Sequence, residues 1–199
     1  FGCSAKIASP SAFVQQRGKM DPSAMISLFD LFVKKTDSNR SYKGYRLIAA
    51  DGSDIQIPTN PNDADSYFPG VDGSAPYNLL HMDAMYDLQS HTYTDVTLIG
   101  QRKVNERDAL CSMIDRSPMK KVLLIADRGY EGYNLMAHLQ EKQWCFLIRI
   151  QDIVHSRGIA AGLDLPVKDE FDISINLSLT RKSTNAVKQL CKERNRYRF

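Results

Sequence analysis

One uninterrupted apolar run constrains the fold of this chain more than any other feature. In residues 121–127, KVLLIAD, five consecutive apolar residues lie between a lysine and an aspartate. Such a run is typical of a buried β-strand that is covered on both faces. A helical pattern in residues 132–144 and a second apolar strand pattern in residues 145–151 follow directly. This part of the chain therefore predicts a strand, a crossover helix and a further strand.

The sequence before this run predicts three strands and a helix. Residues 45–58 alternate, with Asp54 on one face and Leu47, Ala49, Asp51, Ser53, Ile55 and Ile57 on the other. Residues 58–76 are rich in Pro, Gly, Asn and Asp and predict a long loop. Two strands, 77–88 and 92–99, are joined by the polar turn QSH, and a helix follows Asn105 as its N-cap. The order predicts an α/β fold, a mixed sheet with helices on its faces.

The two ends of the chain differ from this central part. Residues 9–20 and 21–35 read as helices, the second with Asp21 as N-cap and Pro22 in the first turn. Residues 170–182 alternate strictly and predict a separate antiparallel element. The last twenty residues hold a basic cluster with aromatic residues among the arginines, which can bind a phosphate backbone or form a solvated helix face. Its members are Arg181, Lys182, Lys188, Lys192, Arg194, Arg196 and Arg198.

Composition narrows the class of protein. With 199 residues and 43% hydrophobic content, the chain can bury one substantial core. No apolar run approaches the roughly 20 residues of a membrane-spanning helix, so we expect a soluble protein with no membrane partner. The four cysteines form no CxxC pair, which is typical of free thiols in a reducing compartment.

Two aspartates on strands carry the candidate chemistry. Asp51 lies on the first predicted strand and Asp127 ends the fourth. Two such acids on neighbouring strands repel each other unless a cation lies between them, and carboxylate oxygens suit Mg²⁺ or Mn²⁺. The alternative is that each aspartate only caps the following turn or helix. We expect solvent-facing or turn roles for Asp54, Asp83 and Asp87, and structural roles for His81 and His91.

Three segments in this order resemble a known family: LIAADGSDIQIP, YNLLHMDAMYDLQSHTYTDV and VLLIADRGYEGYNLMAHLQEKQWCFLIRI. Together they resemble the catalytic core of bacterial insertion-sequence DDE transposases, in the group with an Asp-Arg-Gly-Tyr second motif, over residues 45–152. The resemblance implies a ribonuclease H-like fold and two divalent ions, Mg²⁺ or Mn²⁺. It also implies cleavage of double-stranded DNA at transposon ends with strand transfer, by a full-length protein that is a homodimer in the bacterial cytoplasm, at the nucleoid.

The motif positions assign roles to individual residues. By resemblance, Asp51 is the first catalytic and metal-binding acid and Asp127 the second. Arg128 faces DNA phosphate or forms a surface ion pair, Gly129 permits the turn geometry, and Tyr130 packs or stacks.

The third acid of the family is a glutamate in a helical Tyr-x-x-Arg-x-x-x-Glu pattern, and no segment here matches it. Neither Glu170 nor Glu193 has the required neighbours. We expect this glutamate beyond Phe199, after a β-rich insertion that begins at residue 153, and we expect the chain to be inactive without it.

These patterns predict three regions and leave two other functions open. The regions are an N-terminal helical segment (1–44), a catalytic core (45–152), and the start of the insertion with its basic tail (153–199). One alternative is a catalytically incomplete remnant that still binds DNA. The other is a Mg²⁺-dependent phosphotransferase or hydrolase of the doubly wound type, which requires a parallel sheet throughout. The short QSH turn between adjacent strands argues against that sheet.

Overall fold

The computed structural model describes residues 9–38, 40–71, 73–151, 159–160, 163, 165–166, 168 and 170–176. The chain forms two compact units, Phe1–Asn39 and Arg40–Phe199. The first unit contains the two expected helices, α1 (Pro10–Arg17) and α2 (Pro22–Thr36). Each begins with a proline after a capping side chain: Ser9 accepts from the Ala12 backbone N–H, and Asp21 from that of Ser23.

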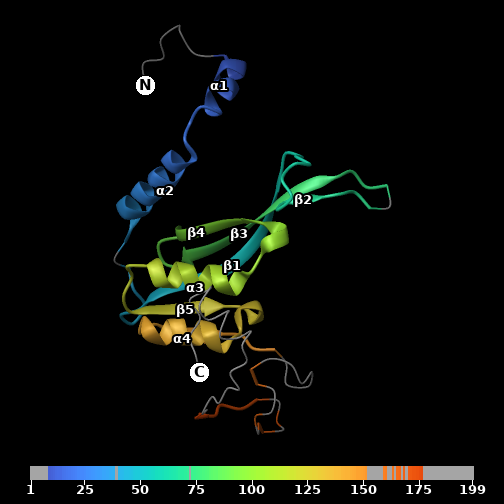
Figure 1. The fold of residues 1–199 in the computed structure, drawn as a ribbon. Helices are drawn as coiled ribbons and strands as arrows, with labels where there is room; N and C mark the ends of the chain where they lie inside the picture. Colours follow the sequence, from blue (N-terminus) through green and yellow to red (C-terminus); the bar gives the residue numbers. More distant parts are fainter. Residues whose placement is uncertain are drawn as a thin grey trace, which may run out of the picture. The chain divides into compact units, whose positions relative to one another are not determined.

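The second unit is built on one six-stranded mixed sheet (Figure 1). Its central strand β1 pairs antiparallel with β3 and parallel with β5, and β6 extends the parallel side. Strands β2 and β4 both pair antiparallel with β3. The strands are β1 (Arg46–Ile57), β2 (Tyr67–Phe68), β3 (Tyr77–Asp87), β4 (Thr92–Gly100), β5 (Val122–Ala126) and β6 (Cys145–Ile148).

This pairing decides between the predicted sheets. The β3–β4 hairpin through the QSH turn and the antiparallel β1–β3 pair exclude the fully parallel sheet of the doubly wound alternative. A mixed sheet flanked by helices is the predicted α/β arrangement and is consistent with a ribonuclease H-like fold, so this prediction is confirmed. The long loop of residues 58–76 is also present, with the two-residue strand β2 inside it.

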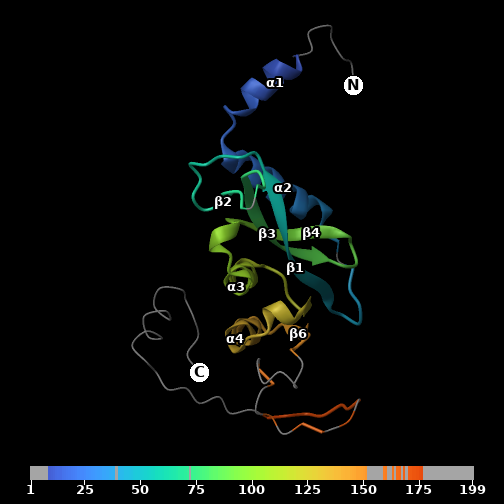
Figure 2. The same ribbon diagram turned by 90° about the vertical axis from the view of Figure 1, so that its right-hand side faces the viewer.

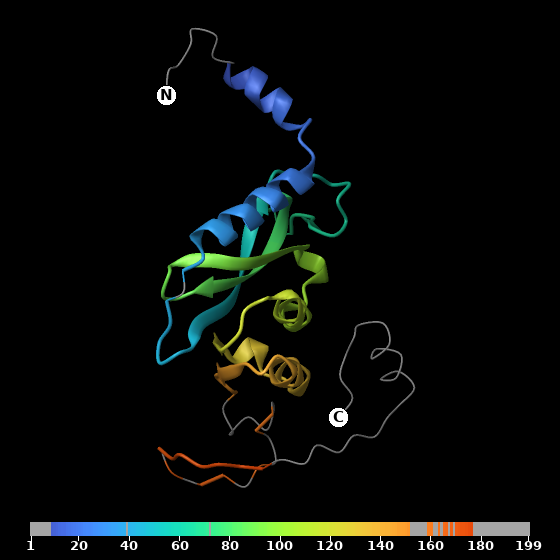
Figure 3. The ribbon, with the colours of Figure 1, turned by 90° about the vertical axis from the view of Figure 1, so that its left-hand side faces the viewer.

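Two helices cover one face of the sheet. Figures 2 and 3 show α3 (Glu106–Arg116) and α4 (Tyr133–Glu141) on the same side of the strands. Short 3₁₀ turns precede them: η1 (Gln101–Lys103) before α3, and η2 (Arg128–Tyr130) before α4. The core between helices and sheet consists of Ile48, Ala50, Met85, Leu110, Cys111, Met113, Ile114, Val122, Leu124, Ala126, Tyr130, Leu135, Leu139 and Trp144.

Side chains on the opposite face of the sheet are more exposed to solvent than the apolar run of β5 predicts. Leu123 and Ile125 of β5 point away from the core and are only half-buried, and Leu147 of β6 is 63% exposed. Within the described part of the second unit, both helices lie on the other face. The expectation that β5 is covered on both faces is therefore met on one face only.

Two expectations concern the region after β6. Residues 171–176 of the predicted alternating strand pair with no strand in the described part of the chain, and residues 177–182 lie outside it. Phe171, Ile173 and Ile175 are each 42% exposed, because the described residues offer them no surface on which to pack. Among the described helices, none has the length and apolar character needed to cross a membrane.

A buried ion pair holds the β3–β4 turn to β1. The carboxylate of Asp87 is fully buried and accepts from Arg46 Nη2 at 2.8 Å and Nε at 3.2 Å. It also accepts from the backbone N–H groups of Gln89 and Ser90, so the expected turn role is confirmed, although the side chain does not face solvent. Burial alone would raise the pKa of Asp87, but the hydrogen bonds from Arg46 and the two backbone groups lower it overall.

Replacing Asp87 tests this pair. We expect Asp87→Asn to lower the free energy of unfolding at pH 7 by about 3 kcal/mol, because Arg46 loses its buried counter-charge. The native pKa of Asp87 lies below its unfolded value of about 3.9, so the stabilisation is present above that pH and is lost as the pH falls through the native pKa. Urea denaturation from pH 7 to pH 3 should show the difference between wild type and variant shrinking in acid.

The matched control is the exposed pair of Asp65 and Lys103, whose side chains are 51% and 65% exposed. Asp65→Asn should cost about 0.5 kcal/mol or less. An equally small cost for Asp87→Asn, or a difference that does not change with pH, would contradict the role assigned to the buried pair.

Candidate active site

Parallel pairing of β1 and β5 brings the two candidate acids together along the sheet. The paired positions run up to Ala50 and Ala126, so Asp51 and Asp127 are the next residues on adjacent strands. The backbone is still extended at Asp127, with φ −80° and ψ −177°. Neighbouring strands lie about 4.8 Å apart, and residues at matched positions project to the same face. This arrangement is compatible with the prediction that both carboxylates share an ion.

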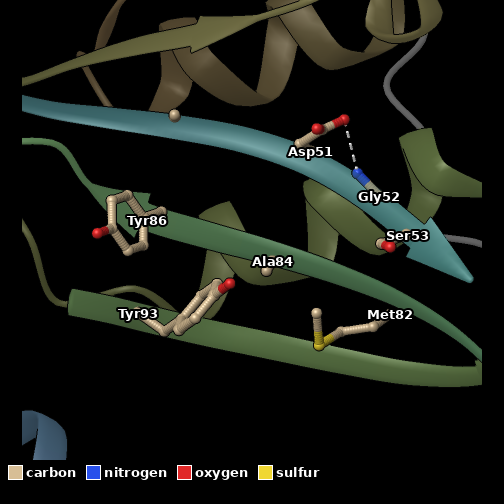
Figure 4. A pocket seen from close by; sticks show the side chains of 8 residues that line it. Asp51, Gly52, Ser53, Met82, Ala84, Tyr86 and Tyr93 are labelled. Atoms are coloured by element: carbon tan, nitrogen blue, oxygen red, sulfur yellow. Dashed lines mark hydrogen bonds between the residues drawn. The ribbon is translucent and has the colours of Figure 1, made fainter. Parts of the chain in front are cut away.

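Both carboxylates keep oxygen atoms available for a ligand. Asp51 Oδ1 accepts from the Gly52 backbone N–H at 2.9 Å (Figure 4), and Asp127 Oδ1 accepts from that of Gly129 at 2.7 Å. Both side chains are exposed, and neither forms an ion pair with a cation in the described part of the chain. Such carboxylate oxygens fit Mg²⁺ or Mn²⁺. However, no three His, Cys, Asp or Glu side chains among the described residues are already arranged to hold a metal ion.

A shallow pocket of about 240 Å³ adjoins Asp51. It opens on the sheet face away from α3, because Ala50 and Met85, which alternate with its lining residues, belong to the core. The rings of Tyr86 and Tyr93 pack edge to face there, with centroids 5.1 Å apart. The pocket is lined by residues of β1, β3 and β4: Ala49, Asp51, Gly52, Ser53, Met82, Ala84, Tyr86 and Tyr93. Figure 4 labels all of them except Ala49.

On the α3 side of the same strands lies a buried polar cluster, which we define as His81, Asp83, Glu106 and Tyr130. His81 and Asp83 come from β3 and are 5% and 0% exposed. His81 Nε2 lies 3.5 Å from Asp83 Oδ1 and 3.4 Å from Glu106 Oε1, and the Tyr130 hydroxyl donates to Asp83 Oδ1 at 3.4 Å. At the other side of the ring, His81 Nδ1 donates to Asp54 Oδ1 at 2.7 Å.

The charges in this cluster act on one another. Burial alone would lower the pKa of His81, but Asp54, Asp83 and Glu106 outweigh it and raise the pKa, which favours the imidazolium. Burial raises the pKa of Asp83, and His81 and the Tyr130 hydroxyl oppose this shift in part. Burial and the negative charges of Asp83, Glu106 and Asp51 raise the pKa of Tyr130 strongly. Asp51 is therefore within electrostatic reach of the cluster.

The remaining residues of the second motif occupy different surroundings. Arg128 is exposed beside Asp127 and is available to a phosphate group. Tyr130 is only 2% exposed, so its ring packs in the core and is not available to stack on a base. Gly129 lies in the turn η2 as expected, but without a positive φ, so the backbone conformation itself does not require glycine there. The basic cluster of residues 181–198 lies outside the described residues.

Sequence reasoning missed the buried cluster. It expected Asp83 to face solvent or a turn, but Asp83 is fully buried, and Glu106 was not considered. The available signal was the alternation within β3: His81, Asp83 and Asp87 share the face of Met85 on a strand that is otherwise largely apolar. Polar residues repeated at every second position on a buried face indicate a polar network, because each must find a partner.

Gly52 tests the packing between β1 and this cluster. A Cβ atom at Gly52 would lie 2.5 Å from His81 Nε2 and 3.3 Å from Glu106 Oε1. We expect Gly52→Ala to lower the free energy of unfolding by about 1–3 kcal/mol, measured by urea denaturation, because the ring must shift. The same substitution should cost much less in a His81→Ala background, where the ring is absent. Equal costs in the two backgrounds would show that His81 does not limit the space at Gly52.

Comparison with known proteins identifies the family. The sequence model of the transposase DDE domain matches residues 42–196, which is more than half of the chain and includes Asp51, the buried cluster and Asp127. No curated protein matches the chain. Transposases act on DNA, and the family generally uses divalent metal ions. On the strength of this match and of its mixed, helix-flanked sheet, the chain belongs to the transposase DDE domain family.

Proposed function

We propose that this chain is the catalytic core of a bacterial insertion-sequence transposase, in the group with the Asp-Arg-Gly-Tyr second motif. Its reaction would be hydrolysis of a phosphodiester at the transposon end, which frees a 3′ hydroxyl, followed by attack of that hydroxyl on a phosphodiester of the target DNA. One observation supports the proposal: Asp51 and Asp127 directly follow Ala50 and Ala126, the last paired positions of two adjacent parallel strands, and no cationic side chain of the described part is paired to them.

Each residue of the site has a role in this proposal. Asp51 and Asp127 hold divalent ions, Mg²⁺ or Mn²⁺, two in the complete enzyme. Ions held there would supply electrostatic stabilisation of an in-line displacement. Arg128 is exposed next to Asp127 and would contact a phosphate of the bound strand. The basic cluster of residues 181–198 would bind duplex DNA in a salt-sensitive way, and the full-length protein would act as a homodimer in the bacterial cytoplasm, at the nucleoid.

A second candidate function is DNA binding without catalysis. It is favoured by the incomplete set of acids, since the described residues hold no group of three ready to bind a metal ion. The two candidates differ in one measurable property, which is whether the protein binds Mg²⁺ or Mn²⁺. A catalytic core binds the ion through Asp51 and Asp127, whereas a remnant binds DNA with no metal-dependent change.

The catalytic proposal predicts separate effects on cleavage and on DNA binding. In the full-length parent, Asp127→Asn should slow cleavage of transposon-end DNA by about 100-fold or more, because loss of the charge weakens metal binding. Binding of the same DNA should stay nearly unchanged, because phosphate contacts lie on basic residues elsewhere. Cleavage is read on a denaturing gel with Mg²⁺, and binding by gel shift without it.

The control is Glu141→Gln at the exposed end of α4, which removes one negative charge at a different place on the same core. It should leave both cleavage and binding at the wild-type level. Cleavage by Asp127→Asn at the wild-type rate would remove Asp127 from the catalytic residues.

A further inference from the structure

We propose that Glu106, in the first turn of α3, is a further cation-binding acid of this site and acts together with Asp127. This inference rests on the proposed function, because it adds a ligand to the same divalent-cation site. Glu106 is 38% exposed, so its carboxylate can reach solvent and an ion. Its position in the chain, on a helix between β4 and β5, differs from that of the glutamate sought after β6.

Two glycines of the sequence motifs allow Glu106 to approach the two candidate acids. A Cβ atom at Gly129 would lie 3.0 Å from Asp127 Oδ1 and 3.4 Å from Glu106 Oε2, so oxygen atoms of both acids lie beside this one glycine. A Cβ atom at Gly52 would lie 3.3 Å from Glu106 Oε1. Neither glycine has a positive φ, so the backbone does not require glycine at either position. The absence of a side chain at these two positions instead lets the Glu106 carboxylate lie close to the backbone, beside Asp51 in one case and Asp127 in the other.

Two buried polar atoms in the cluster that contains Glu106 have no hydrogen-bond partner. His81 Nε2 is buried and makes no hydrogen bond, although it faces the carboxylates of Glu106 and Asp83. Asp83 Oδ2 is also buried without a partner. Buried polar atoms without partners are rare in folded proteins and often indicate an absent water or ion. The Nε2–H of an imidazolium can only donate, so the partner it lacks is a water, such as one in the shell of an ion, and not the ion itself. Here they lie beside an acid that forms no hydrogen bond and whose one ionic neighbour among the described residues is His81.

Several carboxylates close together also favour a cation. Asp51, Asp83 and Glu106 all act on the buried phenol of Tyr130, whose hydroxyl bonds to Asp83. The cationic side chain that lies beside these groups is His81, which Asp54, Asp83 and Glu106 share. Arg107 lies nearby, but its Nε donates to the Gly129 carbonyl oxygen at 2.9 Å. Mg²⁺ needs only one or two protein carboxylates and keeps several waters. Asp127 and Glu106 can provide that pair, because Asp127 Oδ1 and Glu106 Oε2 both lie beside Gly129 and both side chains reach solvent.

A simpler role for Glu106 is a favourable interaction with the N-terminus of α3. Asp108 lies in the same first turn and provides a matched control for that effect. Its carboxylate accepts from Asn105 Nδ2, and an asparagine can keep this hydrogen bond. If Glu106 acts only on the helix terminus, replacing either acid should change stability slightly and leave cation binding unchanged.

The test is Mn²⁺ binding to the whole chain, measured by calorimetry and by the EPR signal of free Mn²⁺, with folding checked by circular dichroism. We expect Glu106→Gln to weaken Mn²⁺ binding about tenfold or more, as Asp127→Asn does, and Asp108→Asn to change it less than about twofold. Glu106→Asp keeps the charge on a shorter side chain and should give an intermediate affinity. This second variant separates loss of a ligand from loss of the fold.

The outcomes separate this inference from the proposed function. Weaker binding in Asp51→Asn and Asp127→Asn, with wild-type affinity in Glu106→Gln, would overturn the role of Glu106 and leave the proposed function standing. Equal weakening in Glu106→Gln and Asp108→Asn would also overturn it, in favour of the helix terminus. Wild-type affinity in both aspartate variants, or no Mn²⁺ binding by the wild type, would overturn both proposals.

Discussion

The parallel pairing between β1 and β5 is the constraint on which the candidate site depends. These strands are separated by the β3–β4 hairpin and α3 in the sequence, yet their pairing ends at Ala50 and Ala126. Asp51 and Asp127 therefore follow at matched positions on neighbouring strands. A shift of one residue in this pairing would send one of the two side chains to the opposite face of the sheet. The geometry of the site is thus set by backbone hydrogen bonds and by the packing that holds the strands in register.

That register is maintained from both sides of β1. On the helix-covered face, Ile48 and Ala50 pack with Leu124 and Ala126 in the core beneath α3 and α4. The ion pair of Arg46 and Asp87 ties the start of β1 to the end of β3. Farther along β1, Gly52 lies against the ring of His81, which leaves no room for a side chain. The apolar core therefore holds β1 at Ala50, and the polar cluster holds it at Gly52. Asp51 lies between these two positions along the strand.

The sequence was sufficient to predict most helices and strands of the described part, because these elements depend on local patterns, whereas the roles of Asp51 and Asp127 remain predictions. Strand alternation, the apolar run of β5, and the capping residues Asp21 and Asn105 act over a few residues. The roles of Glu106 and His81 could not be predicted in this way, since their partners are distant in sequence and meet only when α3 packs on the sheet. Tyr130 shows the same limit: it belongs to the second motif, but its ring is buried in the core and its hydroxyl donates to Asp83 of β3.

The central claim is that Asp51 and Asp127 bind one divalent ion, and anomalous diffraction from crystals soaked in Mn²⁺ tests it most directly. The account predicts an anomalous peak at the ends of β1 and β5, about 2.1–2.2 Å from one oxygen of each carboxylate, with waters completing the shell. Crystals of Asp127→Asn treated in the same way should lose the peak. A Mn²⁺ peak that contacts neither Asp51 nor Asp127, or a peak at this site that persists in Asp127→Asn, would contradict the account.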